Sequence, residues 1–212
     1  MTRRALAASL LIGLAALAAA PRPAEAQFGP LDIRATAEAG ITTFSAGRSF
    51  DAVTGSPSGP TWGGGVEAVF GGRVGVGLRA SRFAVRGERV FPFEGTIFRL
   101  GVPATIMVTP IELTGTYRVP LGRLVPYGGG GVGWHRYAET SPVADPGEDV
   151  RETAVGYHVL GGAEVRLASW IGVAGEAQWT RVPGALTGGL AQAFGESDLG
   201  GRAVRVRVIV GR

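Results

Sequence analysis

Apolar and polar residues alternate along eight segments of the chain, at residues 32–45, 62–70, 73–85, 104–119, 124–138, 152–167, 170–182 and 200–211. A period of two is typical of β-strands with two unlike faces. Long connections at residues 46–61, 86–103, 139–151 and 183–199 take turns with short ones at residues 71–72, 120–123 and 168–169. This rhythm predicts an all-β fold, an eight-stranded antiparallel up-and-down transmembrane β-barrel with its short turns on the periplasmic side.

The last segment shows the two faces most clearly, because valines at positions 204, 206, 208 and 210 alternate with Arg205 and Arg207. A shift of one residue would exchange the two faces of a strand. In a membrane it would turn arginines toward lipid, at a cost of about 2–4 kcal/mol each at the bilayer midplane. The strand register is therefore strongly specified if lipid surrounds the barrel.

The polar faces point into the predicted lumen and carry acidic and basic side chains together. We expect an ion-pair network there, formed by Arg34, Glu38, Glu67, Arg79, Glu112, Arg118, Glu164, Arg166, Glu176, Arg205 and Arg207. Arg73 falls on the same face. Enclosed charges need partners, and the planar fork of arginine can hold two carboxylates. The network would close the lumen and fix the register; the competing interpretation makes these residues the lining of a small pore.

Aromatic residues cluster near both ends of the apolar faces. Phe70, Tyr117 and Trp170 fall near the short turns, whereas Trp62, Trp134 and Trp179 fall toward the long connections. Two aromatic girdles at the two membrane interfaces are expected of a transmembrane barrel.

The first 26 residues have the features of a cleaved signal peptide. Arg3 and Arg4 precede an apolar run over residues 5–17, and Ala24-Glu25-Ala26 forms an Ala-x-Ala cleavage site. We therefore expect a signal peptide at residues 1–26 and a single barrel domain at residues 27–212. Export would place this domain at the outer membrane of a Gram-negative-type bacterium.

Composition narrows the functional classes. The predicted leader contains three Arg and one Glu, which leaves 18 basic against 16 acidic residues in the mature domain. A net charge of +2 without a basic cluster gives little support for nucleic-acid binding. The chain has no Cys, which excludes disulfides, thiolate metal sites and thiol catalysis.

No motif indicates catalysis, a cofactor or a metal. Gly128-x-Gly130-x-x-Gly133 matches the dinucleotide fingerprint by letter, but a strand-like stretch follows it where that fingerprint needs a helix. The acidic stretch around Asp145 and Glu152 is interpreted as a solvated loop, and its spacing does not fit an EF-hand. No Ser accompanies His135 or His158 on a shared face, as a nucleophile–base pair would require. We therefore predict a non-enzyme without cofactor or metal.

Two stretches resemble a known family. Val108-Thr109-Pro110-Ile111-Glu112-Leu113-Thr114-Gly115-Thr116-Tyr117-Arg118-Val119-Pro120-Leu121-Gly122 and Val125-Pro126-Tyr127-Gly128-Gly129-Gly130-Gly131-Val132-Gly133-Trp134 are similar to consecutive strands of the OmpA/OmpX-like eight-stranded outer-membrane barrels. The resemblance extends from about Leu31 to Arg212. It implies insertion by the barrel-assembly machinery, contact with outer-membrane lipid and lipopolysaccharide, and a role in envelope integrity, adhesion, serum resistance or limited permeability.

The sequence thus predicts a monomeric outer-membrane barrel with a structural or adhesive role, whose long loops bind an extracellular ligand. Two alternatives stay open. One is a narrow porin-like diffusion channel, which needs a hydrated lumen. The other is a soluble periplasmic calyx that binds an apolar ligand, which needs the apolar faces to point inward.

Overall fold

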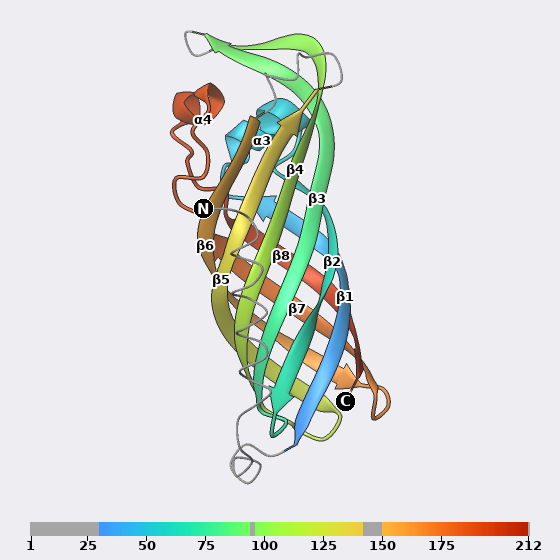
Figure 1. The fold of residues 1–212 in the computed structure, drawn as a ribbon. Coiled ribbons are helices and arrows are strands. Elements are labelled where there is room, and N and C mark those ends of the chain that lie inside the picture. The colour runs from blue at the N-terminus through green and yellow to red at the C-terminus, as the bar shows by residue number, and fades with distance from the viewer. Residues whose placement is uncertain (1–29, 94–95, 142–149, 212) are drawn as a thin grey trace, which may run out of the picture.

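The computed structural model describes residues 30–93, 96–141 and 150–211. Within these ranges, eight antiparallel strands pair in chain order, and β1 pairs with β8 to close a barrel (Figure 1). The strands are β1 (Leu31–Phe44), β2 (Ser58–Phe70), β3 (Val74–Phe93), β4 (Thr96–Arg118), β5 (Leu124–Thr140), β6 (Val150–Arg166), β7 (Ile171–Arg181) and β8 (Gly201–Gly211). The predicted fold class is confirmed.

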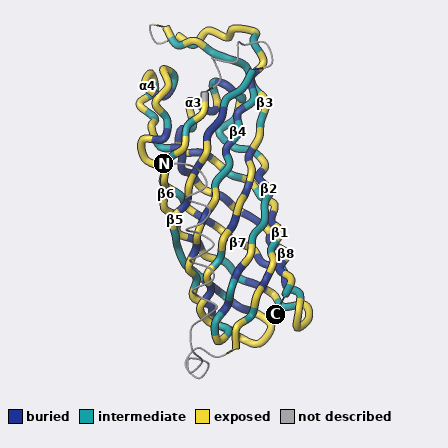
Figure 2. The backbone as a smooth tube through the Cα atoms, viewed as in Figure 1, coloured by how far each residue is buried: buried dark blue, intermediate teal, exposed yellow. Residues whose placement is uncertain are grey.

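The apolar faces of the strands lie on the outside of the barrel. In β8, Val204 is 67% exposed while Arg205 is 6% exposed, and this alternation runs along each strand as bands of exposed and buried residues (Figure 2). A calyx for an apolar ligand needs the opposite arrangement. The calyx alternative therefore disagrees with the facing of the strands.

The connection predicted over residues 86–103 is wrong, because β3 and β4 continue as a paired hairpin to Phe93 and Thr96. β2 follows β3 only to Phe83, and β5 follows β4 only from Thr105. The β3–β4 hairpin, residues 86–93 and 96–103, thus extends beyond the barrel wall and bends over its upper end (Figure 1). Its aromatic and β-branched residues favour a strand, and this signal is independent of period-two alternation.

Two short helices occupy parts of the predicted long connections: α3 (Gly47–Thr54) and α4 (Gly189–Phe194). The α3 ring of Phe50 stacks on Phe44 of β1 at a centroid distance of 4.1 Å, and the Phe83 ring packs edge-on against Phe44 at 4.8 Å. Val182 and Leu199 complete this buried apolar cluster. Neither helix in the described part of the chain is long and apolar enough to cross a membrane. The apolar cluster lies at the upper end of the barrel.

Glycines let β4, β5 and β6 approach closely. A Cβ atom at Gly129 would lie 2.0 Å from the carbonyl oxygen of Gly115, and one at Gly131 would lie 1.9 Å from that of Leu113. Backbone atoms cannot give way as a flexible side chain can, so any larger residue would force the strands apart. The glycine run of β5 is therefore part of the barrel wall, as expected, and no helix follows it.

Glu196 joins the segment after α4 to the start of α3. Its carboxylate accepts hydrogen bonds from the backbone N–H groups of Arg48 and Ser49, at 3.1 and 2.8 Å, and from the Ser49 hydroxyl at 2.8 Å. Burial raises the pKa of this carboxyl, but the hydrogen bonds from Ser49 and Arg48 outweigh burial, so the pKa of Glu196 lies below its ordinary value.

The lowered pKa of Glu196 predicts that the contact between the start of α3 and the segment after α4 weakens in acid. The stabilisation is complete above the ordinary carboxyl pKa and is lost as the pH falls through the lowered value of the folded state. Hydrogen–deuterium exchange of α4, corrected for intrinsic rates, should therefore rise as the pH falls below the ordinary carboxyl pKa of about 4.5. Glu196→Gln should exchange fast throughout this range. If wild type and variant keep the same pH profile, Glu196 does not control the contact.

Candidate functional site

Arg79 of β3 lies at the centre of a charged cluster inside the barrel. Its guanidinium contacts Glu112 of β4 at 2.9 Å and Glu176 of β7 at 2.7 Å. It also lies 3.4 Å from Glu38 of β1 and donates to the amide oxygen of Gln178. These side chains come from four strands, so the cluster spans the lumen from wall to wall.

Two arginines of β8 complete this level of the lumen. Arg207 donates to Glu176 Oε2 at 2.9 Å, and Arg205 donates to the Gln178 amide oxygen at 2.8 Å. The Tyr127 hydroxyl donates to Glu176 Oε2 at 3.1 Å. Each Glu176 oxygen is therefore held by more than one donor, as a buried carboxylate requires.

A second charged level lies nearer the short turns. Arg118 of β4 pairs with Glu67 of β2 at 3.5 Å and contacts Glu164 of β6. Arg34 of β1 reaches the same Glu164 carboxylate at 3.0 Å. The Arg118 guanidinium also lies over the Tyr127 ring, 5.6 Å from its centroid, which links the two levels.

The structure places ten of the eleven predicted lumen residues in the interior, with less than one tenth of each exposed. Arg166 is the exception: its side chain is 34% exposed, and its Nε atom lies 3.7 Å from Glu164 Oε1. It therefore lies at the edge of the network. Arg73, which we also expected inside, is exposed next to the turn after β2.

The network also contains neutral side chains, which were not among its predicted members. Gln178 donates to Glu112 Oε1 at 2.7 Å, and the Thr114 hydroxyl lies 2.9 Å from Nε2 of His158. The signal for them was available, because all three side chains fall on the inward faces of their strands. The predicted members were chosen by acidic and arginine side chains alone, so these three residues were not among them.

The two histidines lie beside the same carboxylate. Glu112 Oε1 is 3.6 Å from Nδ1 of His158 and 3.9 Å from Nε2 of His135. No group of three or more metal-binding side chains occurs among the residues that the structure describes. Glu152 is described, but Asp145 and the rest of the predicted acidic loop over residues 142–149 lie outside the described residues.

The free space beside the charged network around Arg79 is small, whereas hollows of about 220 and 380 Å³ lie toward the two ends of the barrel. A cavity of about 40 Å³ lies between the apolar cluster and the charged network, bordered by Phe83, His135 and Arg205. A second of about 30 Å³ borders Glu67 and Arg79. Each could hold only a few water molecules. The charged network around Arg79 is therefore closely packed.

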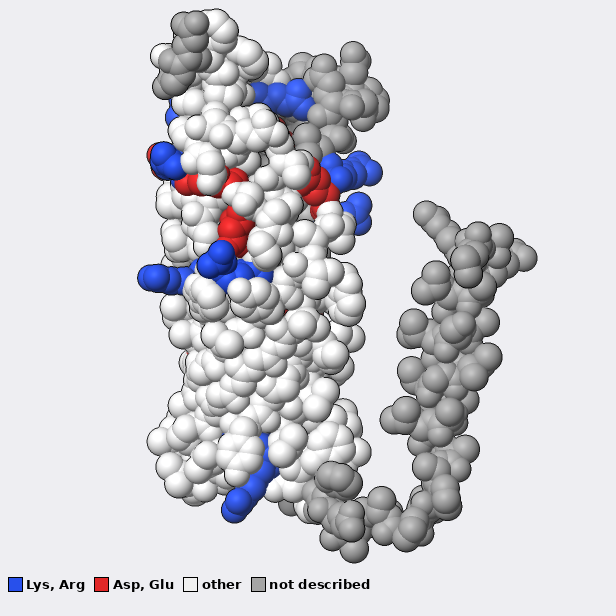
Figure 3. Space-filling model, turned by 90° about the vertical axis from the view of Figure 1, so that its left-hand side faces the viewer, with Lys and Arg blue, Asp and Glu red and all other residues white. Residues whose placement is uncertain are grey.

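The six predicted girdle residues lie at the two ends of the exterior. Trp62, Trp134 and Trp179 are 63%, 50% and 39% exposed, and Tyr117 and Trp170 are 54% and 56% exposed. Phe70 is partly buried at the end of β2. Figure 3 shows a broad exterior band almost free of charge, with charged atoms gathered above it. The arrangement matches an apolar band that ends in aromatic residues.

Comparison with known proteins agrees with this geometry. A family model described as "Outer membrane protein beta-barrel domain" matches residues 6–208. The chain belongs to this family. No curated protein matches the chain significantly.

Among solved structures, the chain is similar to the Neisserial surface protein A (NspA). The TM-score is 0.54 at 12% sequence identity, and the match covers 85% of this chain and 96% of the NspA chain. The N-terminal barrel domain of Pseudomonas aeruginosa OprF has a TM-score of 0.49 at 10% identity, with 85% and 97% covered. OprG of the same organism has a TM-score of 0.49 at 15% identity, with 85% and 92% covered. The likeness to NspA supports the barrel fold and carries no functional residue.

Proposed function

We propose that this outer-membrane barrel is a closed, non-conducting anchor that presents an adhesive surface outside the cell. The proposal rests on two groups of side chains that block the lumen one above the other. These are the charged network around Arg79 and, above it, the apolar cluster around Phe83. Opening the charged network would separate buried ion pairs, and opening the apolar cluster would expose packed aromatic rings. Both steps are costly.

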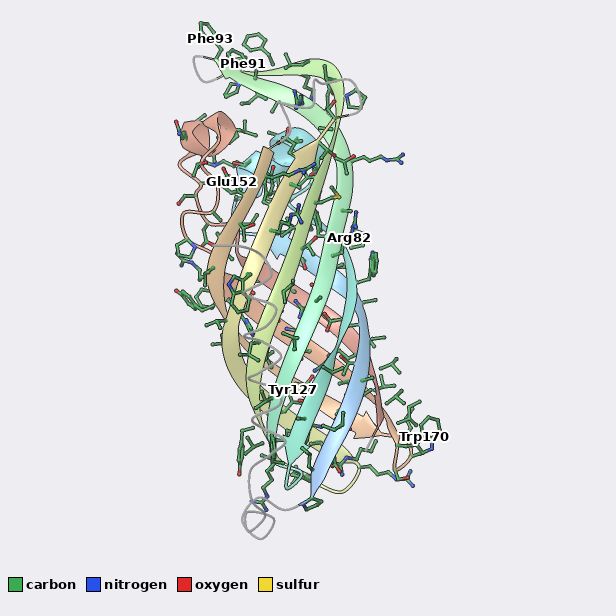
Figure 4. The ribbon with its side chains drawn as sticks, in the orientation of Figure 1. Arg82, Phe91, Phe93, Tyr127, Glu152 and Trp170 are labelled. Carbon is green, nitrogen blue, oxygen red and sulfur yellow. The ribbon has the colours of Figure 1, made fainter. Side chains whose placement is uncertain are left out.

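The β3–β4 hairpin supports adhesion over a purely structural role. Its side chains include four exposed large apolar residues, Phe91, Phe93, Phe98 and Leu100, which are 54%, 55%, 49% and 52% exposed. Phe91 and Phe93 lie at the far end of the hairpin, away from the barrel (Figure 4). Exposed apolar groups gathered at one place indicate an interaction site. We propose that the hairpin binds apolar surfaces.

We also propose how the chain reaches the membrane and which partners and activities it lacks. The chain reaches the outer membrane with a signal peptide at residues 1–26, which lie outside the described residues, and the barrel-assembly machinery inserts it as a monomer. It has no catalytic role, and no nucleic acid is a partner.

The adhesion proposal predicts a loss of binding when the hairpin becomes polar. Cells that display the Phe91→Ser/Phe93→Ser/Phe98→Ser variant should bind octyl-coated beads at least about tenfold less than cells with the wild-type protein, because burial of even one Phe contributes about 1.5–3 kcal/mol and every 1.4 kcal/mol is about tenfold. Arg99→Ser, on the same exposed hairpin, serves as the matched control and should bind normally. Equal binding by all three proteins, at equal surface display, would leave only the structural role.

A further inference from the structure

Arginines surround the outside of the barrel directly above the upper aromatic girdle. Five exposed arginines occupy outward positions of the described strands there: Arg82, Arg136, Arg151, Arg181 and Arg202. Figure 3 shows such basic atoms at the level where the uncharged band ends, and Figure 4 labels Arg82 on β3. The outward positions of β6, β7 and β8 within the described residues contain no carboxylate.

These arginines are placed next to the girdle tryptophans by strand register. Trp62 of β2 is opposite Arg82 of β3, and Trp179 of β7 is opposite Arg202 of β8. Arg181 follows on the same face as Trp179, and its guanidinium lies 5.9 Å from the centre of the indole. Indole rings mark the headgroup level of a membrane. The arginines therefore lie where lipid phosphates lie.

One part of this level has a groove beneath it. An open apolar groove of about 610 Å³ runs over β6, β7 and β8. Gly161 of β6 faces Ala177 of β7, which faces Val204 of β8, so small residues occupy the middle of the groove. Trp179 and Arg202 border it. Small residues beside large ones leave room for an alkyl chain along the wall.

We propose that this groove binds one phosphate-bearing lipid of the outer leaflet. Its acyl chain lies over Gly161 and Ala177, and its phosphate contacts Arg202. Arg181 adds positive charge, although it is paired with Asp198. Arginine suits the task because its planar fork binds two phosphate oxygens and its charge persists at any physiological pH. The inference rests on the proposed membrane orientation, with the long connections outside.

The test measures which lipids lie next to Trp179. Trp62, Trp134 and Trp170 are replaced by Phe, and the protein is placed in vesicles of dioleoyl phosphatidylcholine that contain either dibrominated phosphatidic acid or dibrominated phosphatidylcholine. Bromine quenches nearby indole fluorescence, so quenching reports lipid occupancy beside Trp179. We expect phosphatidic acid to be preferred about fivefold, and Arg202→Gln to lower that preference to about one.

Two further variants separate a built site from general attraction to positive charge. Arg82→Gln removes the same charge at the same level on β3, opposite Trp62 and away from the groove, and should keep the preference. Ala177→Leu fills the groove without changing charge, and should lower the preference. An equal loss in Arg82→Gln and Arg202→Gln, or competition by inorganic phosphate alone, would overturn the lipid site. Absence of quenching by both lipids would instead contradict membrane insertion, and with it the proposed function.

Discussion

Replacing Arg79 with Met should lower the free energy of unfolding by about 3–5 kcal/mol. The substitution keeps most of the side-chain volume but removes the cation that lies between three carboxylates, those of Glu38, Glu112 and Glu176. These acids are almost fully buried, so they would repel one another with little water to screen them. Urea unfolding of the protein in lipid vesicles, followed by tryptophan fluorescence, measures the change.

Arg82→Met is the matched control, because Arg82 lies in the same strand but points outward and is exposed. Its effect should stay below about 1 kcal/mol, as for other exposed charges. If Arg79→Met also costs less than about 1 kcal/mol, water must hydrate the three carboxylates. A lumen that wet would agree with the narrow-channel alternative and not with a closed barrel.

An arginine on the outer face should be tolerated only near the ends of the strands. Val206 is 59% exposed in the middle of the uncharged face of β8, so Val206→Arg should lower the free energy of unfolding in vesicles by about 2–4 kcal/mol. Thr43 of β1 is opposite Arg202, at the level of the girdle. Thr43→Arg should therefore cost about 0–1 kcal/mol. Equal costs at the two positions would mean that the outer face does not contact lipid.

The side of each strand that faces outward could be predicted from sequence, because apolar and polar residues alternate along the strand. Val204 and Arg205 cannot share a face, whichever fold surrounds them. The same logic selected the members of the lumen network, and it failed only near the strand ends, at Arg73 and Arg166, where a side chain can reach solvent.

The pairing within the network could not be predicted. Arg79 of β3 contacts Glu176 of β7 across the lumen, and such a contact depends on strand tilt and stagger in the closed barrel. The β3–β4 hairpin and the helix α3 were missed for another reason. Both are stabilised by side chains such as Phe50 and Val90 that pack on a distant part of the chain, and local alternation does not contain that information.

Single-channel recording in planar bilayers tests the central claim of a closed lumen most directly. Purified wild-type protein should show no stable current, because two charged levels and the apolar cluster around Phe83 lie in series along the barrel. Arg79→Met, if it inserts, should show at most brief, irregular openings. Large, stable conductance steps from the wild-type protein would contradict the account and make the chain a channel.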